Sequence, residues 1–265
     1  MLQFLRTLLA PRAPGPVAHI PQGQRVYAVG DIHGRLDLFE ALAGAIEADD
    51  ARGTADTTVI LLGDLVDRGP ASAGVLALAR EWQARRKVRI LYGNHEELLV
   101  KSLTSLETMR HFLRHGGRET MQSFGISAKD LASAPVDELQ ELWAAAVPAD
   151  VLDFIAGFEE MIRIGDYLFV HAGINPAMPL AEQKVSDLRW IREPFLSHQE
   201  PFEAVVVHGH SITDQPQDKG NRIGIDTGAY SSGRLTALVL EGATRRYIEA
   251  VEAGGTISIS HFASA

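Results

Sequence analysis

Three apolar runs in the first hundred residues each end at a glycine followed by a polar residue. The runs cover 25–29, 58–62 and 88–92, and their β-branched and aromatic residues predict strands. After each run, apolar residues recur at helical spacing, as Leu38 and Leu42 do after the first. Three consecutive strand–loop–helix units indicate parallel strands that are joined by helical crossovers and covered on both faces.

The remainder of the chain is first helical in pattern and then rich in strands. Residues 103–158 have an irregular helical pattern, which predicts a helical insertion beside the site. The runs 161–164 and 167–170 flank Gly165 and Asp166, an arrangement that is typical of a hairpin. Further strands are predicted at 204–207, 222–225, 235–240 and 246–251.

No low-complexity or linker-like segment divides the chain, so the pattern predicts one α/β domain over residues 25–253. Three prolines follow the short apolar start of the chain, and we expect residues 1–24 to form a flexible arm. Residues 254–265 are expected to form a C-terminal tail.

The composition limits which metal ligands and nucleophiles the chain can offer. The 265 residues include no cysteine and ten histidines, which excludes disulfides, thiolate metal sites and a cysteine nucleophile and leaves nitrogen and oxygen as metal ligands. A net charge of −9 disfavours a general affinity for nucleic acid. No apolar run approaches the roughly 20 residues that span a bilayer. We therefore expect a cytoplasmic protein with neither nucleic-acid nor membrane partners, and its oligomeric state stays open.

Ligand-type side chains follow five of the predicted strands at the ends where crevices form in open α/β sheets. Two carboxylates, one amide oxygen and three imidazoles make a mixed set that suits Mn²⁺, Fe or Zn²⁺. Six ligands exceed the needs of one catalytic ion, so we predict two divalent ions that share one carboxylate. The candidate ligands are Asp31, His33, Asp64, Asn94, His171 and His210.

These motifs together resemble those of the calcineurin-like metallophosphoesterases, and within them the bacterial and bacteriophage serine/threonine phosphatases of the phosphoprotein phosphatase family. The likeness spans residues 30–228 and implies a β-sandwich of two mixed sheets flanked by helices. The motifs that carry it are Asp31-x-His33, Gly63-Asp64-x-x-Asp67-Arg68-Gly69, Gly93-Asn94-His95-Glu96, His171 and Gly209-His210.

The resemblance also implies a role for each motif residue. One ion, expected to be Mn²⁺, would be held by Asp31, His33 and Asp64, and the second by Asp64, Asn94, His171 and His210. A hydroxide bridging the two ions would attack phosphorus directly. His95 would donate a proton to the leaving oxygen, with Asp67 orienting its ring. The phosphate would be bound by Arg68, Arg192 and Asn94.

Several neighbouring residues keep alternative interpretations. Arg189 and Arg163 compete with Arg192 as phosphate ligands. His208, two positions before His210, is interpreted either as a residue that supports the ligands or as a structural one.

Charges and turn residues beside the motifs are given structural roles. Glu96 and Glu97 are interpreted as charges that interact favourably with a helix N-terminus. The segment 226–229, Asp-Thr-Gly-Ala, is treated as structural.

The resemblance favours a phosphatase for phosphoserine and phosphothreonine in proteins or peptides, with phosphotyrosine as a further substrate. The alternative enzyme is a symmetrical dinucleoside-tetraphosphate hydrolase, which is expected to carry alanine in place of Asp67 and aspartate in place of Glu96. A binding module without turnover is disfavoured because all six ligands and His95 are present. Tyr92 and Tyr230 are the aromatic residues that adjoin the ligand motifs, so the sequence gives little sign of walls for stacking a base.

Overall fold

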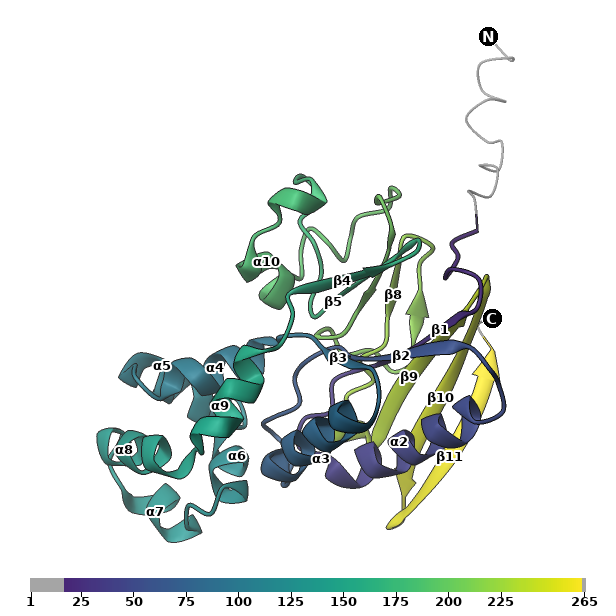
Figure 1. Cartoon of the computed structure of the whole chain (residues 1–265). Helices are drawn as coiled ribbons and strands as arrows, with labels where there is room; N and C mark the ends of the chain where they lie inside the picture. The colour runs from purple at the N-terminus through teal and green to yellow at the C-terminus, as the bar shows by residue number, and fades with distance from the viewer. Residues whose placement is uncertain (1–16, 264–265) are drawn as a thin grey trace.

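The computed structural model describes residues 17–263, whose strands form two mixed sheets packed face to face (Figure 1). The first sheet has the order β11-β10-β9-β1-β2-β3, with β1 to β3 parallel and the others antiparallel. Its strands are β1 (Gln24–Val29), β2 (Asp56–Leu61), β3 (Val88–Ile90), β9 (Arg234–Glu241), β10 (Thr244–Ala253) and β11 (Thr256–Ala263).

The second sheet has the order β4-β5-β6-β8-β7 and is also mixed. Strands β5, β6 and β8 are parallel, and β4 and β7 run antiparallel at the two edges. Its strands are β4 (Met161–Ile164), β5 (Tyr167–Val170), β6 (Val205–His208), β7 (Gln217–Asp218) and β8 (Arg222–Gly224). The predicted hairpin at 161–170 is confirmed, with Ile164 opposite Tyr167.

The surroundings of strand β1 explain why its run of apolar residues is unbroken. Its side chains alternate between two faces, and both faces are buried. Tyr27 and Val29 pack into a core under α2 (Leu36–Asp50) and α3 (Ser72–Arg85), whereas Val26 and Ala28 face the second sheet. The predicted sandwich of two mixed sheets flanked by helices is therefore confirmed.

The second sheet carries a smaller helical layer on its outer face. Leu168 and Val206 pack there against Leu188 and Phe195, and α10 (Val185–Trp190) lies beyond the sheet in Figure 1. The short helix η1 (Leu180–Glu182) belongs to this half, whereas α11 (Ala229–Ser232) contacts β9 of the first sheet. Among the helices of residues 17–263, none is both long and apolar enough to cross a bilayer.

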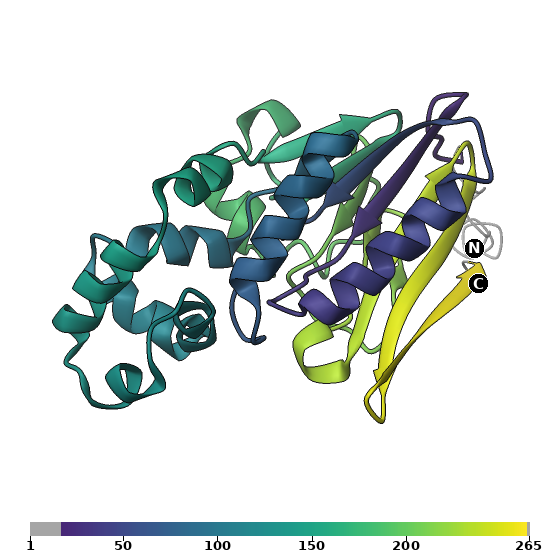
Figure 2. The same cartoon turned by 60° about the horizontal axis from the view of Figure 1, so that its bottom comes forward.

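The predicted insertion is helical and lies to one side of the sandwich, next to α3 (Figures 1 and 2). Trp143 anchors it, because its ring stacks on Phe112 with centroids 5.6 Å apart and its Nε1 donates to Ser102 Oγ at 3.0 Å. Helix α4 (Asn94–Ser102) leads into α5 (Leu106–Arg114), α6 (Gly117–Ser123), α7 (Ala128–Ser133), α8 (Val136–Ala146) and α9 (Ala149–Ala156).

The expected C-terminal tail is wrong for most of its length. Residues 256–263 form β11, which pairs antiparallel with β10 along its whole extent. Gly254 and Gly255 both adopt positive φ, 59° and 80°, and so supply the tight turn between the two strands. The alternation of isoleucine and serine after that turn is the strand signal.

Part of the expected N-terminal arm is also ordered. Residues 1–16 lie outside the described residues, but the segment that follows packs against the sandwich. Ala18 and Ile20 are buried between the two sheets, and Ile20 N donates to Gly242 O at 2.9 Å. The burial of these apolar side chains stabilises the segment against the sandwich, so the flexible arm expected for residues 17–23 is wrong.

Candidate active site

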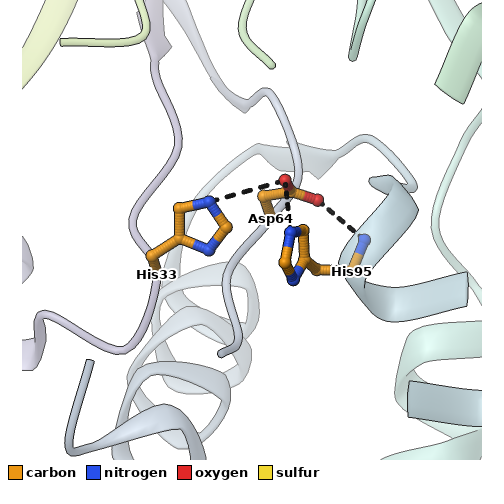
Figure 3. Close-up of side chains that lie close together, drawn as sticks. All are labelled: His33, Asp64 and His95. Carbon is orange, nitrogen blue, oxygen red and sulfur yellow. Dashed lines mark hydrogen bonds and ion pairs between the residues drawn. The ribbon is translucent and has the colours of Figure 1, made fainter. Parts of the chain in front are cut away.

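The predicted ligands converge where strands of both sheets end. Asp64, which follows β2, lies at the centre of Figure 3. Its Oδ2 is 3.6 Å from His33 Nε2, and its Oδ1 is 3.4 Å from His171 Nε2. We call Asp31, His33, Asp64, Asn94, His171 and His210 the Asp64 cluster; all are buried except His210, which is half-buried.

Hydrogen bonds fix two imidazoles of the cluster in one tautomer. His33 Nδ1 donates to Val66 O and His171 Nδ1 donates to Leu62 O, each at 2.8 Å. A carbonyl oxygen can only accept, so each ring keeps its proton on Nδ1 and turns the Nε2 lone pair toward Asp64. Burial lowers the pKa of both rings, which keeps them neutral. Both are therefore prepared to bind a metal ion.

Asn94 brings a further oxygen to the same point. Its Oδ1 lies 2.9 Å from His171 Nε2 and 2.8 Å from His210 Nδ1. Because His171 Nε2 carries no proton, two lone pairs face each other in this contact, and a cation beside them relieves their repulsion. The donors of the cluster fit a divalent metal ion on this ground.

The side chains form two groups with metal-ligand spacing that share Asp64. One contains His33 and His95, and the other contains His171 and His210, with ligand atoms within 4.8 Å of one another. Asp31, expected in the first group, is not among its members. Its carboxylate accepts the backbone N–H of His210 at 3.0 Å, and burial together with Asp226 and Asp64 raises its pKa.

Backbone strain is concentrated in the loops of the site. Within residues 17–263, every non-glycine residue with positive φ is a predicted site residue, and each such conformation costs roughly 1–3 kcal/mol. Glycines make room for the ligands, since a Cβ at Gly93 would lie 2.2 Å from Asp64 Oδ1. The strained residues are His33, Asp64, Asp67, Arg68 and His210.

Glu96 has a role that the sequence interpretation missed. It is fully buried, and its carboxylate accepts the backbone N–H groups of Asp64, Leu65 and Gly93 at 2.9, 2.7 and 3.0 Å. It therefore ties the loop after β2 to the start of α4. Burial and the nearby Asp64 raise the pKa of Glu96 to about 7. Its place three residues after the helix N-cap, as in a capping box, was the available signal.

His95 and Asp67 form the expected buried pair. His95 Nδ1 donates to Asp67 Oδ2 at 2.7 Å, and His95 Nε2 points into the cluster, 3.9 Å from Asp64 Oδ2. Burial lowers the pKa of His95, but Asp64 and Asp67 outweigh that effect and raise it. The two carboxylates therefore favour the protonated form of the His95 ring.

A family model described as "Calcineurin-like phosphoesterase" matches residues 24–234, most of the chain. The chain belongs to this family. It is accordingly a hydrolase that acts on phosphate esters, in a family whose members use dimetal centres.

Relatives within the calcineurin-like phosphoesterases carry different substrate names. The chain is 28% identical to Serine/threonine-protein phosphatase 1 of Salmonella typhimurium, over 80% of this chain and 90% of that one. It is 33% identical to a symmetrical Bis(5'-nucleosyl)-tetraphosphatase of Acidovorax ebreus over 68% of this chain, and spans only about half, 51%, of that relative. A solved structure of a putative diadenosine tetraphosphatase aligns with TM-score 0.59 and 23% identity, covering 95% of this chain and 97% of that one.

The phosphoesterase site has two arginines at its edge. Arg68 Nη1 lies 2.9 Å from His33 Nε2, and Arg68 Nη2 lies 3.0 Å from His95 Nε2. Arg192 is exposed and donates to His210 O at 3.2 Å, and so borders the other group. A guanidinium can only donate, so His95 Nε2 accepts from Arg68 in this arrangement, and a proton on Nε2 requires Arg68 to turn away from it.

Arg189, an alternative phosphate ligand, and His208, which lies two residues before the candidate metal ligand His210, both have other partners. Arg189 is paired with Glu160 and Glu97, and its guanidinium lies 3.8 Å from the centre of the Tyr92 ring. His208 is buried with its ring edge-on to Phe195, on the outer face of the second sheet.

Two exposed aromatic rings border the centre, one beside each group of ligands. Tyr230 is 37% exposed with its ring centroid 5.5 Å from that of His33. Trp190 is 36% exposed with its centroid 6.5 Å from that of His210. The sequence interpretation missed Trp190, because only the fold brings α10 to His210. We call Arg68, Arg192, Trp190 and Tyr230 the rim.

Proposed function

We propose that this phosphoesterase removes phosphate from serine and threonine side chains of proteins, at a centre of two divalent metal ions. The observation that carries the proposal is Asp64, shared between two groups of ligands, with His95 facing it. A relative named as a serine/threonine phosphatase that aligns over most of both chains supports the substrate class.

The two ions would be held by the Asp64 cluster. Asp31, His33 and Asp64 would bind one, and Asp64, Asn94, His171 and His210 the other. Nitrogen and oxygen donors of this kind suit Mn²⁺. When bound, such ions would lower the pKa of a coordinated water molecule and offset charge on the phosphoryl oxygens.

Residues of the chain itself would bind the phosphate and move the proton. Arg68 and Arg192 present planar forks that match phosphate oxygens, with the Asn94 amide beside them. His95 would give its Nε2 proton to the departing serine or threonine oxygen, a poor leaving group that needs an acid. Asp67 accepts from His95 Nδ1, and so holds the ring with Nε2 toward the ester and favours its protonated state.

A second candidate function is hydrolysis of a symmetrical dinucleoside tetraphosphate. The rim favours it, because Trp190 and Tyr230 are partly exposed aromatic rings on which a base could stack. One face of Tyr230 already lies 4.7 Å from the Arg68 guanidinium, so its other face would be the stacking face. The 33% identical relative carries that activity in its name. Against it, Asp67 and Glu96 stand where the motif resemblance leads us to expect alanine and aspartate in such a hydrolase.

A substrate panel separates the two functions. Purified enzyme with Mn²⁺ would be assayed on phosphoserine and phosphothreonine peptides and on diadenosine tetraphosphate at one pH. We expect kcat/KM to be higher for the peptides. A tenfold preference for the dinucleotide, about 1.4 kcal/mol of transition-state discrimination, would instead assign the second function and leave the cluster unchanged.

A further inference from the structure

The helical insertion reaches the active site through Thr120, a buried residue of α6. Its Oγ1 lies 2.6 Å from Asp67 Oδ1 and 2.9 Å from Asp67 N. A third partner is Ser72 Oγ at the start of α3, 2.9 Å away. Thr120 is 53 residues from Asp67 in the sequence, so only the position of the insertion brings the two together.

The directions of these hydrogen bonds follow from the chemistry of a hydroxyl group, which has one hydrogen and two lone pairs. The Asp67 carboxylate accepts, so it takes the Thr120 hydrogen. The Asp67 backbone N–H is shared between Thr120 Oγ1 and Ser72 Oγ, at 2.9 and 3.0 Å, and the Ser72 hydroxyl must donate to the remaining lone pair of Thr120 Oγ1. The one hydrogen and both lone pairs of the Thr120 hydroxyl are therefore engaged in hydrogen bonds, and these bonds fix the orientation of the side chain.

This network fixes the carboxylate that holds His95. Within the part of the chain that the structure describes, Thr120 is the donor to Asp67 Oδ1, while Oδ2 accepts from His95 Nδ1. Asp67 has φ of 72°, a conformation that its surroundings must hold in place. The Thr120 bonds to the Asp67 backbone and carboxylate both act at this strained residue.

The insertion also contacts the next residue of the loop. Gly116 O accepts the backbone N–H of Arg68 at 3.0 Å. A Cβ at Gly116 would lie only 2.4 Å from Arg68 N, so the turn before α6 fits closely against the strained pair. The insertion therefore supports the whole Asp67–Arg68 segment.

We propose that Thr120 is a positioning residue for proton donation: it orients the Asp67 carboxylate and, through it, the His95 ring. The inference rests on the proposed function in one respect, the role of His95 as proton donor. The helical insertion then helps to set the geometry of the acid in addition to enclosing the site.

Three substitutions isolate the hydroxyl group. Thr120→Val keeps the shape of the side chain and removes its hydrogen bonds, whereas Thr120→Ser keeps the hydroxyl. Thr108→Val is the matched control, because the Thr108 hydroxyl bonds only Ser105 Oγ within the insertion. With Mn²⁺ and a phosphoserine peptide, Thr120→Val should lower kcat about 10- to 100-fold, the usual effect of losing an outer partner of a site residue. Thr120→Ser and Thr108→Val should stay within about threefold of wild type.

The leaving group and a second substitution show whether Thr120 acts through His95. With p-nitrophenyl phosphate, whose leaving group needs little protonation, the loss in Thr120→Val should shrink. In a His95→Asn background, Thr120→Val should cause no further loss in kcat, since coupled residues are not additive. An unchanged kcat in Thr120→Val, or a full additional loss in the His95→Asn background, would overturn the proposal.

The single His95→Asn variant separates this inference from the proposed function. If that variant keeps wild-type kcat on the peptide, the proton-donor role fails and the inference fails with it. If His95→Asn is impaired and Thr120→Val is not, only the inference fails. Should thermal unfolding show that Thr120→Val is not folded, Thr120→Ala leaves more room and faces the same tests.

Discussion

The Asp64 cluster and the rim border the same centre, but the protein holds them in different ways. All cluster side chains except the half-buried His210 are buried, backbone carbonyls fix the rings of His33 and His171, and three cluster residues sit on strained backbone. Rim side chains are half-buried or exposed, and the Arg192 guanidinium donates to His210 O and Ser211 Oγ. We propose on this basis that the cluster sets the reaction. Arg68 and Arg192 of the rim would then bind the phosphate, and Trp190 and Tyr230 would meet the rest of the substrate. Relatives named for different substrates are consistent with this division.

The largest effect is expected at the centre of the cluster. Asp64→Asn removes the charge shared by both groups of ligands, so metal content should fall and kcat/KM should drop by at least about a thousandfold, equivalent to about 4 kcal/mol. Asp150→Asn, an exposed aspartate of the insertion that pairs with Arg80, serves as the control. Elemental analysis and phosphatase assays would measure both. Retention of full activity in Asp64→Asn would refute the shared ligand.

His95→Asn tests the acid at the edge of the cluster. We expect kcat on a phosphoserine peptide to fall about 10²- to 10⁴-fold, the usual contribution of a positioned general acid. Metal content should remain near that of wild type, because His95 is proposed as donor and not as ligand. A matching loss of metal would move His95 into the ligand set, which its geometry in the first group also allows.

Arg192 and Arg189 differ in what surrounds them, and the difference predicts separate consequences. Arg192→Ala should raise KM for phosphopeptides about tenfold, since a hydrogen bond to a charged group contributes about 1.5–3 kcal/mol. Arg189→Ala should lower thermal stability with little change in KM, because its guanidinium is engaged by Glu160, Glu97 and Tyr92. Steady-state kinetics and thermal unfolding of both variants would test these two roles. A raised KM in Arg189→Ala, with lowered thermal stability in Arg192→Ala, would show that the two roles are exchanged.

The smallest effects are expected from the aromatic residues of the rim. Trp190→Leu and Tyr230→Leu should each lower kcat/KM by about three- to tenfold for phosphotyrosine peptides and diadenosine tetraphosphate, whose rings can stack on them. Values for phosphoserine peptides should change less than twofold. Equal losses for all three substrates would show that these rings support the fold of the rim and do not select the substrate.

The sequence predicted the elements and residues that depend on local pattern. Asp31, Asp64 and His171 follow apolar strands directly, and the carboxyl ends of such strands meet at one edge, so the pattern alone was enough to group these residues. Predicted strands 25–29, 167–170 and 235–240 all lie within observed strands.

What the sequence did not predict depends on contacts between distant segments. The burial of Glu96, the hydrogen bonds of Thr120 and the position of Trp190 beside His210 each require the fold to place residues side by side. Strand β11 was missed for a different reason. Its side chains are mostly exposed, so its alternation lacks a buried apolar face, and the predicted tail begins at the preceding pair of glycines.

The central claim is that one chain binds two metal ions through a shared Asp64, and counting ions in active enzyme tests it most directly. Enzyme loaded with Mn²⁺, freed of excess metal and assayed for phosphatase activity would be submitted to elemental analysis. The account predicts close to two ions per chain, with activity rising as the second site fills. Full activity with no more than one ion per chain would contradict it.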